Sequence, residues 1–184
     1  MNRVLRASLA VGITSVALFA TVAEGENSSS GGGSETTAVA SSQAAPIPIG
    51  TAVEVAADWD LKVNSAELDA NATMAAANMF NTPQPGSQYV LVNVSVTNNS
   101  DQPEAPFTNL KLSLLPPSGV AIDSAFVAGV PGALDTSAQM QPNATATGSV
   151  VFEVPSTDVP GSVLLGQSLF TLDTKKDQKF FAIQ

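Results

Sequence analysis

The sequence contains no cysteine and no histidine, and only 5% of its 184 residues are aromatic. Without Cys and His the chain cannot build a Ser-His-Asp or Cys-His catalytic arrangement, a Cys/His zinc site, a type-1 copper site or a c-type haem attachment. No disulfide can form, so packing alone must hold the fold. Hydrophobic residues make up 44% of the chain, so a core of mostly Val, Leu and Ala is expected.

Positive charge is scarce as well. The chain has 7 basic and 16 acidic residues, a formal net charge of −9. Arg3 and Arg6 lie in the first segment, and without them 5 basic residues stand against 16 acids, a charge of −11. Such a surface repels phosphate backbones and anionic lipids, so we expect no nucleic-acid partner. The same charge favours a soluble monomer.

Common catalytic motifs are missing too. No S-x-x-K precedes any of the lysines, and the chain has no G-x-S-x-G elbow and no G-x-x-x-x-G-K phosphate loop. The glycines at 31–33 neither follow a strand pattern nor open a helix. The sequence therefore predicts a protein that is not an enzyme, with no cofactor and no catalytic, cofactor-binding or metal-binding residue.

Residues 1–23 are typical of a secretory signal peptide. Two arginines precede an uncharged, mostly apolar run from Ala7, which ends in Thr21-Val22-Ala23, small residues suited to signal peptidase. The alternative is an uncleaved membrane anchor, but the polar interruptions make the run marginal for a bilayer core of about 30 Å. A thioether lipid anchor is excluded because the chain has no Cys. We expect a secreted, extracellular protein cleaved near Ala23.

Residues 24–49 are rich in Gly, Ser, Thr and Ala and predict a disordered linker, because this composition buries too little surface to offset chain entropy. Residues 50–184 predict one domain. Its short alternating apolar runs end at turn residues and predict strands, with one Ala-rich helix at 70–80 in a long connection. No helices alternate with the strands. The expected fold is all-β, an immunoglobulin-like antiparallel β-sandwich of about seven or eight strands. The predicted strands are 51–56, 59–69, 88–98, 109–115, 147–155, 162–173 and 179–183, with room for another short strand within 120–129.

The stretch 88–98, QYVLVNVSVTN, has the clearest strand pattern. Its valines at even positions should face the core, with Tyr89 and Leu91 packed on part of the other side. Ser95 should face solvent, so Ser95→Asp should be nearly neutral where Val94→Asp is costly. In 59–69 the apolar phase slips, which predicts a β-bulge near Asn64.

Carboxylates are the main remaining candidates for chemistry. Asp58 and Asp60 are two residues apart and would share a strand face, as a calcium pair or an acid/base pair, although a solvated face is the simpler interpretation. The stretch from Asp69 begins like an EF-hand loop, but Met74 and Phe80 occupy the positions that need Gly and a bidentate Glu.

Other residues have simple structural interpretations. Trp59 should be a core anchor rather than an exposed carbohydrate platform, and Glu153 should be solvated. Three methionines could bind Cu(I), but Met is more often a gap-filler: Met74, Met79 and Met140. The N-x-S/T sequons in the predicted domain are treated as accidental: Asn71, Asn93, Asn98 and Asn143.

The order of QYVLVNVSVTNNSDQPEAPF, NLKLSLLPPSGV and QPNATATGSVVFEVP resembles a telokin-like, immunoglobulin-like domain family of unknown function in Gram-positive bacteria. That family is similar in architecture to the immunoprotective extracellular antigen of mycobacteria. The resemblance covers residues 50 to 183 and implies a sandwich in exported proteins, many of them lipoproteins, without assigned catalytic residues.

Together these patterns predict an exported, non-catalytic module that binds an unknown protein or polymer in the cell envelope or outside the cell. Two alternatives stay open, a calcium-stabilised structural domain and a hydrolase that uses only carboxylates.

The export prediction has a direct test. N-terminal sequencing of the chain from its native cells should give Glu24 as the first residue, because Ala23 ends the predicted cleavage site. The intact 184-residue chain in the membrane fraction would show instead that the segment is a retained anchor.

Overall fold

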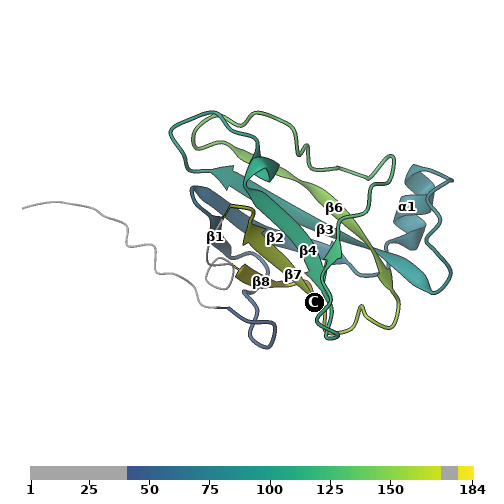
Figure 1. Ribbon diagram of the computed structural model, residues 1–184. Helices are drawn as coiled ribbons and strands as arrows, with labels where there is room; N and C mark the ends of the chain where they lie inside the picture. The colour runs from purple at the N-terminus through teal and green to yellow at the C-terminus, as the bar shows by residue number, and fades with distance from the viewer. Residues whose placement is uncertain (1–40, 171–177) are drawn as a thin grey trace, which may run out of the picture. The chain divides into compact units, whose positions relative to one another are not determined.

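The computed structural model describes residues 41–170 and 178–184. The predicted signal peptide and most of the predicted linker lie outside the described residues. Within the described part the chain forms eight strands, one α-helix and one 3₁₀ turn (Figure 1). In chain order these are β1 Ala52–Ala56, β2 Trp59–Glu67, α1 Asn71–Ala77, β3 Ser87–Asn98, η1 Pro106–Thr108, β4 Leu110–Leu115, β5 Ile122–Asp123, β6 Thr145–Pro155, β7 Val163–Ser168 and β8 Gln178–Ala182.

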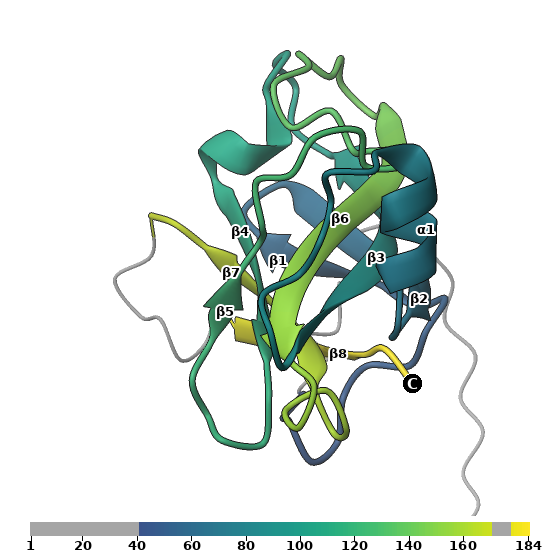
Figure 2. The ribbon, with the colours of Figure 1, turned by 90° about the vertical axis from the view of Figure 1, so that its right-hand side faces the viewer.

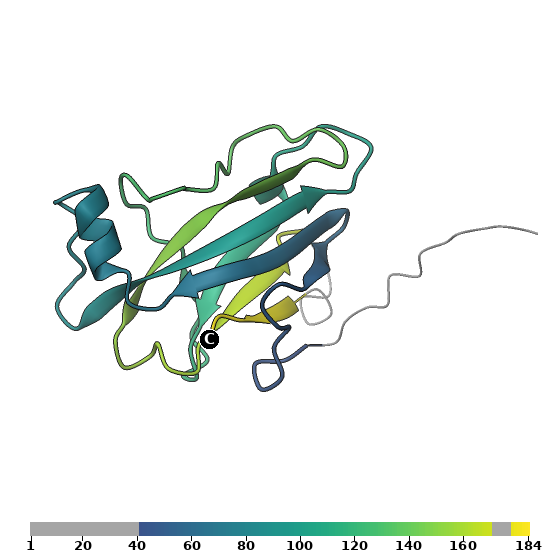
Figure 3. The same ribbon diagram turned by 180° about the vertical axis from the view of Figure 1, so that it is seen from behind.

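The strands form two four-stranded antiparallel sheets, in the orders β1-β2-β3-β6 and β5-β4-β7-β8. Figure 2 shows β4, β5 and β7 on one side and β2, β3 and β6 on the other, with α1 against the outside of β3. The view from behind shows β1, β2, β3 and β6 running along one layer (Figure 3). The predicted all-β antiparallel sandwich is confirmed.

Strand β3 lies between β2 and β6 and carries the centre of the core. Because side chains alternate along a strand, every second residue of β3 faces the second sheet. The four valines on this face are completely buried: Val90, Val92, Val94 and Val96. Buried residues of the other sheet belong to the same hydrophobic cluster, among them Leu110, Leu114, Leu164 and Phe181. The predicted valine face is confirmed.

The predicted bulge in the second strand is also present. The pairing of β2 with β3 shifts register between Val63 and Ser65. Residues before the shift keep Trp59, Leu61 and Val63 in the core, where each is fully buried. The single extra residue moves the following side chains to the opposite face.

The packed chain begins earlier than the predicted boundary at residue 50. Ile47 is buried, and its N–H donates to the carbonyl of Phe180 at 2.7 Å. Its own carbonyl accepts from the N–H of Ala182 at 2.8 Å. The backbone of Ile47, between two prolines, therefore pairs with the edge of β8, which a composition average over residues 24–49 could not reveal.

The short strand predicted within 120–129 is present as β5, and the rest of that stretch is not a strand. The chain then runs along β6, where the N–H of Ala125 donates to the carbonyl of Val151 at 2.8 Å. Further on, the N–H of Ser149 donates to the carbonyl of Gly132 at 2.7 Å. A Cβ atom on Gly148 would lie 2.5 Å from the Cα atom of Leu134. Gly148 thus permits the close crossing that covers the edge of β6.

Ser95 differs from its predicted role as a solvated residue. It is 8% exposed, and its hydroxyl accepts from the Asn64 amide at 2.9 Å and shares a hydrogen bond with Thr147 at 2.8 Å. A carboxylate at position 95 would disturb both partners, so the expected neutrality of Ser95→Asp is wrong.

A better pair for testing the register is Val94→Asp against Ser65→Asp. Val94→Asp should lower the free energy of unfolding by about 4 kcal/mol, because it buries an unpaired carboxylate. Ser65 is exposed, so Ser65→Asp should change it by less than about 0.5 kcal/mol. Denaturant titration followed by the fluorescence of Trp59, the only Trp, measures both. If Val94→Asp and Ser65→Asp lower the free energy of unfolding equally, the assignment of inward and outward side chains in β2 and β3 is wrong.

Candidate functional site

The outer face of the β1-β2-β3-β6 sheet is divided into an apolar half and a polar half. At the start of β3, Tyr89 and Leu91 belong to a second hydrophobic cluster with Val151 of β6. Toward the end of β3 the same face carries Asn93, Ser95 and Thr97. The two halves offer different kinds of surface, and each contains a candidate site.

The polar half is held together by side-chain hydrogen bonds across three strands. The Asn64 amide donates to Asn93 Oδ1 at 2.9 Å, and the Asn93 amide donates to Ser149 Oγ at 3.2 Å. Ser95 and Thr147 share a bond of 2.8 Å. These amides and hydroxyls bond to one another, as cross-strand pairs do in stable sheets, so the ladder is first of all structural.

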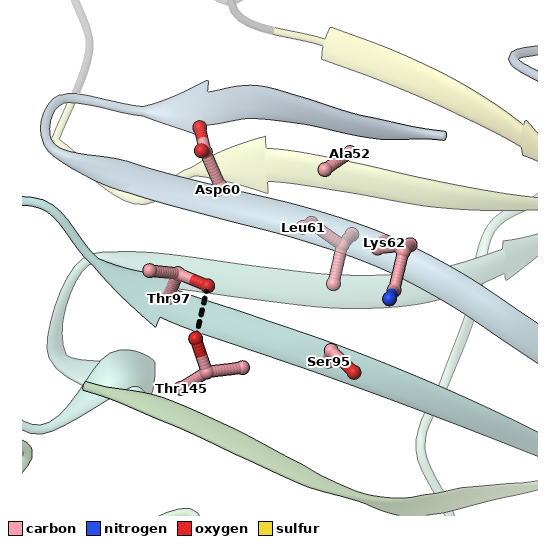
Figure 4. Close-up of a pocket in the computed structure, with 7 residues that line it drawn as sticks. All are labelled: Ala52, Asp60, Leu61, Lys62, Ser95, Thr97 and Thr145. Carbon is pink, nitrogen blue, oxygen red and sulfur yellow. Dashed lines mark hydrogen bonds between the residues drawn. The ribbon is translucent and has the colours of Figure 1, made fainter. Parts of the chain in front are cut away.

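A shallow hollow of about 150 Å³ opens beside this ladder (Figure 4). Thr97 and Thr145 share a hydrogen bond of 2.8 Å at one side of it. Asp60 and Lys62, on the same face of β2, supply one carboxylate and one ammonium group. The other lining residues are Ala52, Leu61 and Ser95.

The structure does not support the predicted pairing of Asp58 with Asp60. Asp58 lies in the turn between β1 and β2 with φ 64°, and its carbonyl accepts from the N–H of Asn99 at 2.7 Å. It is therefore outside the strand and does not alternate with Asp60. Since only Asp60 lines the hollow, the second carboxylate that glycoside hydrolysis needs is missing from it.

The segment that begins at Asp69 is occupied by local contacts. The Asp69 carboxylate accepts from the N–H of Asn71 at 3.5 Å, and the Asn71 side chain accepts from the N–H of Tyr89 at 2.9 Å. Thr73 donates to the Glu67 carboxylate at 2.7 Å. These oxygens fasten α1 to the sheet. Across residues 41–170 and 178–184, no three Asp or Glu side chains gather into a possible metal site.

The three methionines do not come together. Met74 is buried in the second cluster and Met140 in the main one, whereas Met79 is 80% exposed. Trp59 is a fully buried core residue, as predicted, and its indole N–H has no hydrogen-bond partner.

Asn98 is the most constrained of the sequon residues. It is fully buried, and its amide donates to the carbonyls of Gln102 and Met140 at 2.9 and 3.0 Å. Its role is to tie two connections together. Glu153, predicted to be solvated, is half-buried and accepts from the N–H of Gln84 at 2.6 Å.

The apolar half of the outer face is covered by α1 and by the segment after β5. The second cluster consists of Ala70, Met74, Tyr89 and Val151, with Leu91, Ala125, Val127 and Val130 packed against it. Met74 is the buried residue of α1. A seven-residue helix is too short to be stable alone, so this packing fixes its position.

Three large apolar side chains stand out from this cover. Met79 and Phe80, just after α1, are 80% and 83% exposed, and Phe126 is fully exposed. Their two connections touch, because the Asn81 amide donates to the carbonyls of Met74 and Ala128 at 3.2 and 2.9 Å. We call Met79, Phe80 and Phe126 the α1-end surface.

The backbone beneath this surface is well bonded. The Asn78 side chain accepts from the N–H of Phe80 at 3.0 Å, and the N–H of Thr82 donates to the carbonyl of Phe80 at 3.0 Å. On the other connection, a Cβ atom on Gly129 would lie 3.6 Å from the Ala77 carbonyl oxygen, which is ordinary contact. Phe80 is thus presented on a fixed turn.

Sequence reasoning missed the α1-end surface. Phe80 lay at the end of the predicted helix and Phe126 in the stretch expected to hold a short strand, and neither was predicted to be exposed. The available signal was the early end of the helix at Asn78, whose side chain bonds locally in non-helical backbone.

A family model described as "Domain of unknown function (DUF4352)" matches residues 48–176. The chain belongs to the DUF4352 family. This agrees with the predicted membership in a family of unknown function, while the telokin-like relationship and the exported context stay predictions. No curated protein matches this DUF4352 chain.

Among solved structures, the DUF4352 chain is similar to the yjhA protein from Bacillus subtilis, with 10% identity, a TM-score of 0.49, and coverage of 75% of this chain and 99% of that one. An uncharacterized beta-sandwich protein from Clostridium difficile 630 has 11% identity and a TM-score of 0.46, with coverage of 76% and 95%. A conserved hypothetical protein from Bacillus anthracis has 8% identity and a TM-score of 0.45, with coverage of 74% and 95%. At these sequence identities, no activity can be assigned to the DUF4352 chain from the solved structures.

Within the described residues, none of the helices has the length and apolar character needed to span a bilayer.

Tyr89 gives a spectroscopic test of the second cluster. Burial, followed by the charge of its cross-strand neighbour Glu153, raises the pKa of the Tyr89 phenol above its ordinary value. Because it is the only Tyr, phenolate absorbance should show ionisation above about pH 10. Folding should therefore lose stability as the pH rises above that value.

Glu153→Gln should lower the pKa of Tyr89, since it removes the nearby negative charge. Asp101→Asn, which makes the same change of charge after the far end of β3, should leave it unaltered. A phenolate that forms at the ordinary pKa would mean that the cluster does not cover Tyr89.

Proposed function

We propose that this DUF4352 chain is an exported, non-catalytic β-sandwich module that binds a protein or polymer partner, in the cell envelope or outside the cell, through its α1-end surface. One observation carries the proposal: Met79, Phe80 and Phe126 are exposed together on two connections that contact each other. Exposed clusters of apolar side chains mark interaction sites. Aromatic residues and Met are enriched in protein interfaces.

The composition strengthens this inference. The chain has only eight Phe, and a core short of aromatics would gain by burying them. Instead Phe80 and Phe126 face solvent while the second cluster beneath them is filled by Met74 and Val151. Exposing two aromatic side chains to water costs free energy. A partner that covers Phe80 and Phe126 would explain why the chain keeps them exposed.

The placement of the surface suits a tethered module. Figures 1 and 3 show α1 well away from residues 41–50, where the described chain begins. Binding residues commonly lie on connections held by a rigid scaffold.

The alternatives from the sequence gain less support. The hollow beside Asp60 has one carboxylate, and the described residues contain no group of three acidic side chains that could hold calcium. We therefore base the proposal on binding alone.

Site-specific photocrosslinking in native cells tests the proposal. A photoreactive residue at position 80 or 126 should give the same discrete crosslinked product, because both side chains belong to one surface. Val120 is 68% exposed on a different turn. The photoreactive residue placed at position 120 should not give that product. The product should disappear when Met79→Ser is added. Products that are equal at positions 80 and 120, or no product at all, would overturn the proposal.

A further inference from the structure

Resting on the proposed function, we infer that the α1-end surface takes a protein segment whose apolar side chains are flanked by Lys or Arg. The inference depends on what surrounds Met79, Phe80 and Phe126. Acidic side chains are hydrogen-bonded to α1 and to the connection that carries Phe80, whereas no described lysine lies on α1 or on the two connections of this surface.

Three carboxylates are attached to the elements that form the surface. Glu67 accepts from Thr73 of α1 at 2.7 Å, and Asp69 accepts from the N–H of Asn71 at 3.5 Å. Glu153 accepts from the N–H of Gln84 at 2.6 Å, in the connection that carries Phe80. We call Glu67, Asp69 and Glu153 the acidic rim.

No described lysine lies on α1 or on the connections that carry Phe80 and Phe126. The lysines among the described residues are Lys62 on β2, Lys111 on β4 and Lys179 on β8. Lys111 is paired with Asp123 at 2.9 Å. The rim carboxylates therefore give the α1 end a negative potential, which favours a basic partner and steers it to the surface.

The same rim argues against other occupants. An anionic membrane would be repelled by the rim and by the net charge of −9. In a two-fold dimer the same patch meets itself, so the rim of one copy would face the rim of the other. A basic protein segment satisfies both the apolar centre and the acidic margin.

Binding of labelled synthetic peptides to the purified full chain, measured by fluorescence anisotropy, tests the inference. The probes are an amphipathic Leu/Lys peptide, a Leu/Glu peptide with the same apolar face, and a Ser/Lys peptide without one. The Leu/Lys peptide should bind at least about tenfold more tightly than either of the others. Its affinity should fall between about 0.01 M and 1 M salt, as the Debye length shortens from about 30 Å to 3 Å.

Two variants, each with a matched control, separate the contribution of the apolar side chains to binding from the contribution of the carboxylates. Phe80→Ser/Phe126→Ser should abolish binding, whereas Val120→Ser/Phe170→Ser, which removes exposed apolar side chains elsewhere, should not. Glu67→Gln/Asp69→Asn/Glu153→Gln keeps the hydrogen-bond acceptors of the rim and should weaken binding about tenfold. Glu54→Gln/Asp58→Asn/Asp101→Asn changes the net charge equally at the other end of β3 and should have little effect. Unchanged Trp59 fluorescence confirms that each variant is folded.

The outcomes distinguish the two proposals. Equal affinity for the Leu/Lys and Leu/Glu peptides, or equal effects of the two charge variants, would overturn the basic-partner inference. The proposed function would survive that result if Phe80→Ser/Phe126→Ser still abolished binding. If the Leu/Lys peptide binds Phe80→Ser/Phe126→Ser as tightly as the unsubstituted chain, both the basic-partner inference and the proposed function are overturned. Self-association or attachment to phosphatidylglycerol vesicles that depends on Phe80, with no peptide binding, would overturn the inference in favour of a second copy or a membrane.

Discussion

The structure depends on one row of valines. Val90, Val92, Val94 and Val96 of β3 are fully buried, and β3 is paired along its length with β2 and β6. Because a strand alternates its side chains, this row fixes which residues of β3 face outward. It also sets the register of both neighbours, so that Phe152 and Leu61 join the core. With no disulfide available, this packing must hold the sandwich together.

The outward side of β3 is apolar at its start and polar toward its end. At its start Tyr89 and Leu91 are apolar and need a cover, which α1 and the segment after β5 provide. These covering elements expose Phe80 and Phe126. Farther along, Asn93 and Ser95 bond to neighbouring strands and leave only a shallow polar hollow. The proposed binding surface therefore arises from the elements that cover an apolar stretch on the outer face of the sheet.

Local patterns can be predicted from the sequence, whereas contacts between distant segments cannot. The valine face and the bulge after Val63 were predictable because alternation is a local property. The packing of Ile47 on β8 and the crossing at Gly148 were not, because each joins segments far apart in the chain. Asp58 was placed wrongly for a similar reason: strand alternation was extended into a turn where it no longer applies.

The sequence by itself determined the composition of the core, the excluded chemistries and the all-β sandwich, since these follow from residue types and their two-residue period. Only the tertiary structure decided that Ser95 is buried, that Met74, Met79 and Met140 lie apart, and that the connections carrying the exposed Phe80 and Phe126 contact each other. The physical reason is that exposure is set by which distant segment covers a side chain, and a residue's own neighbours do not specify that segment.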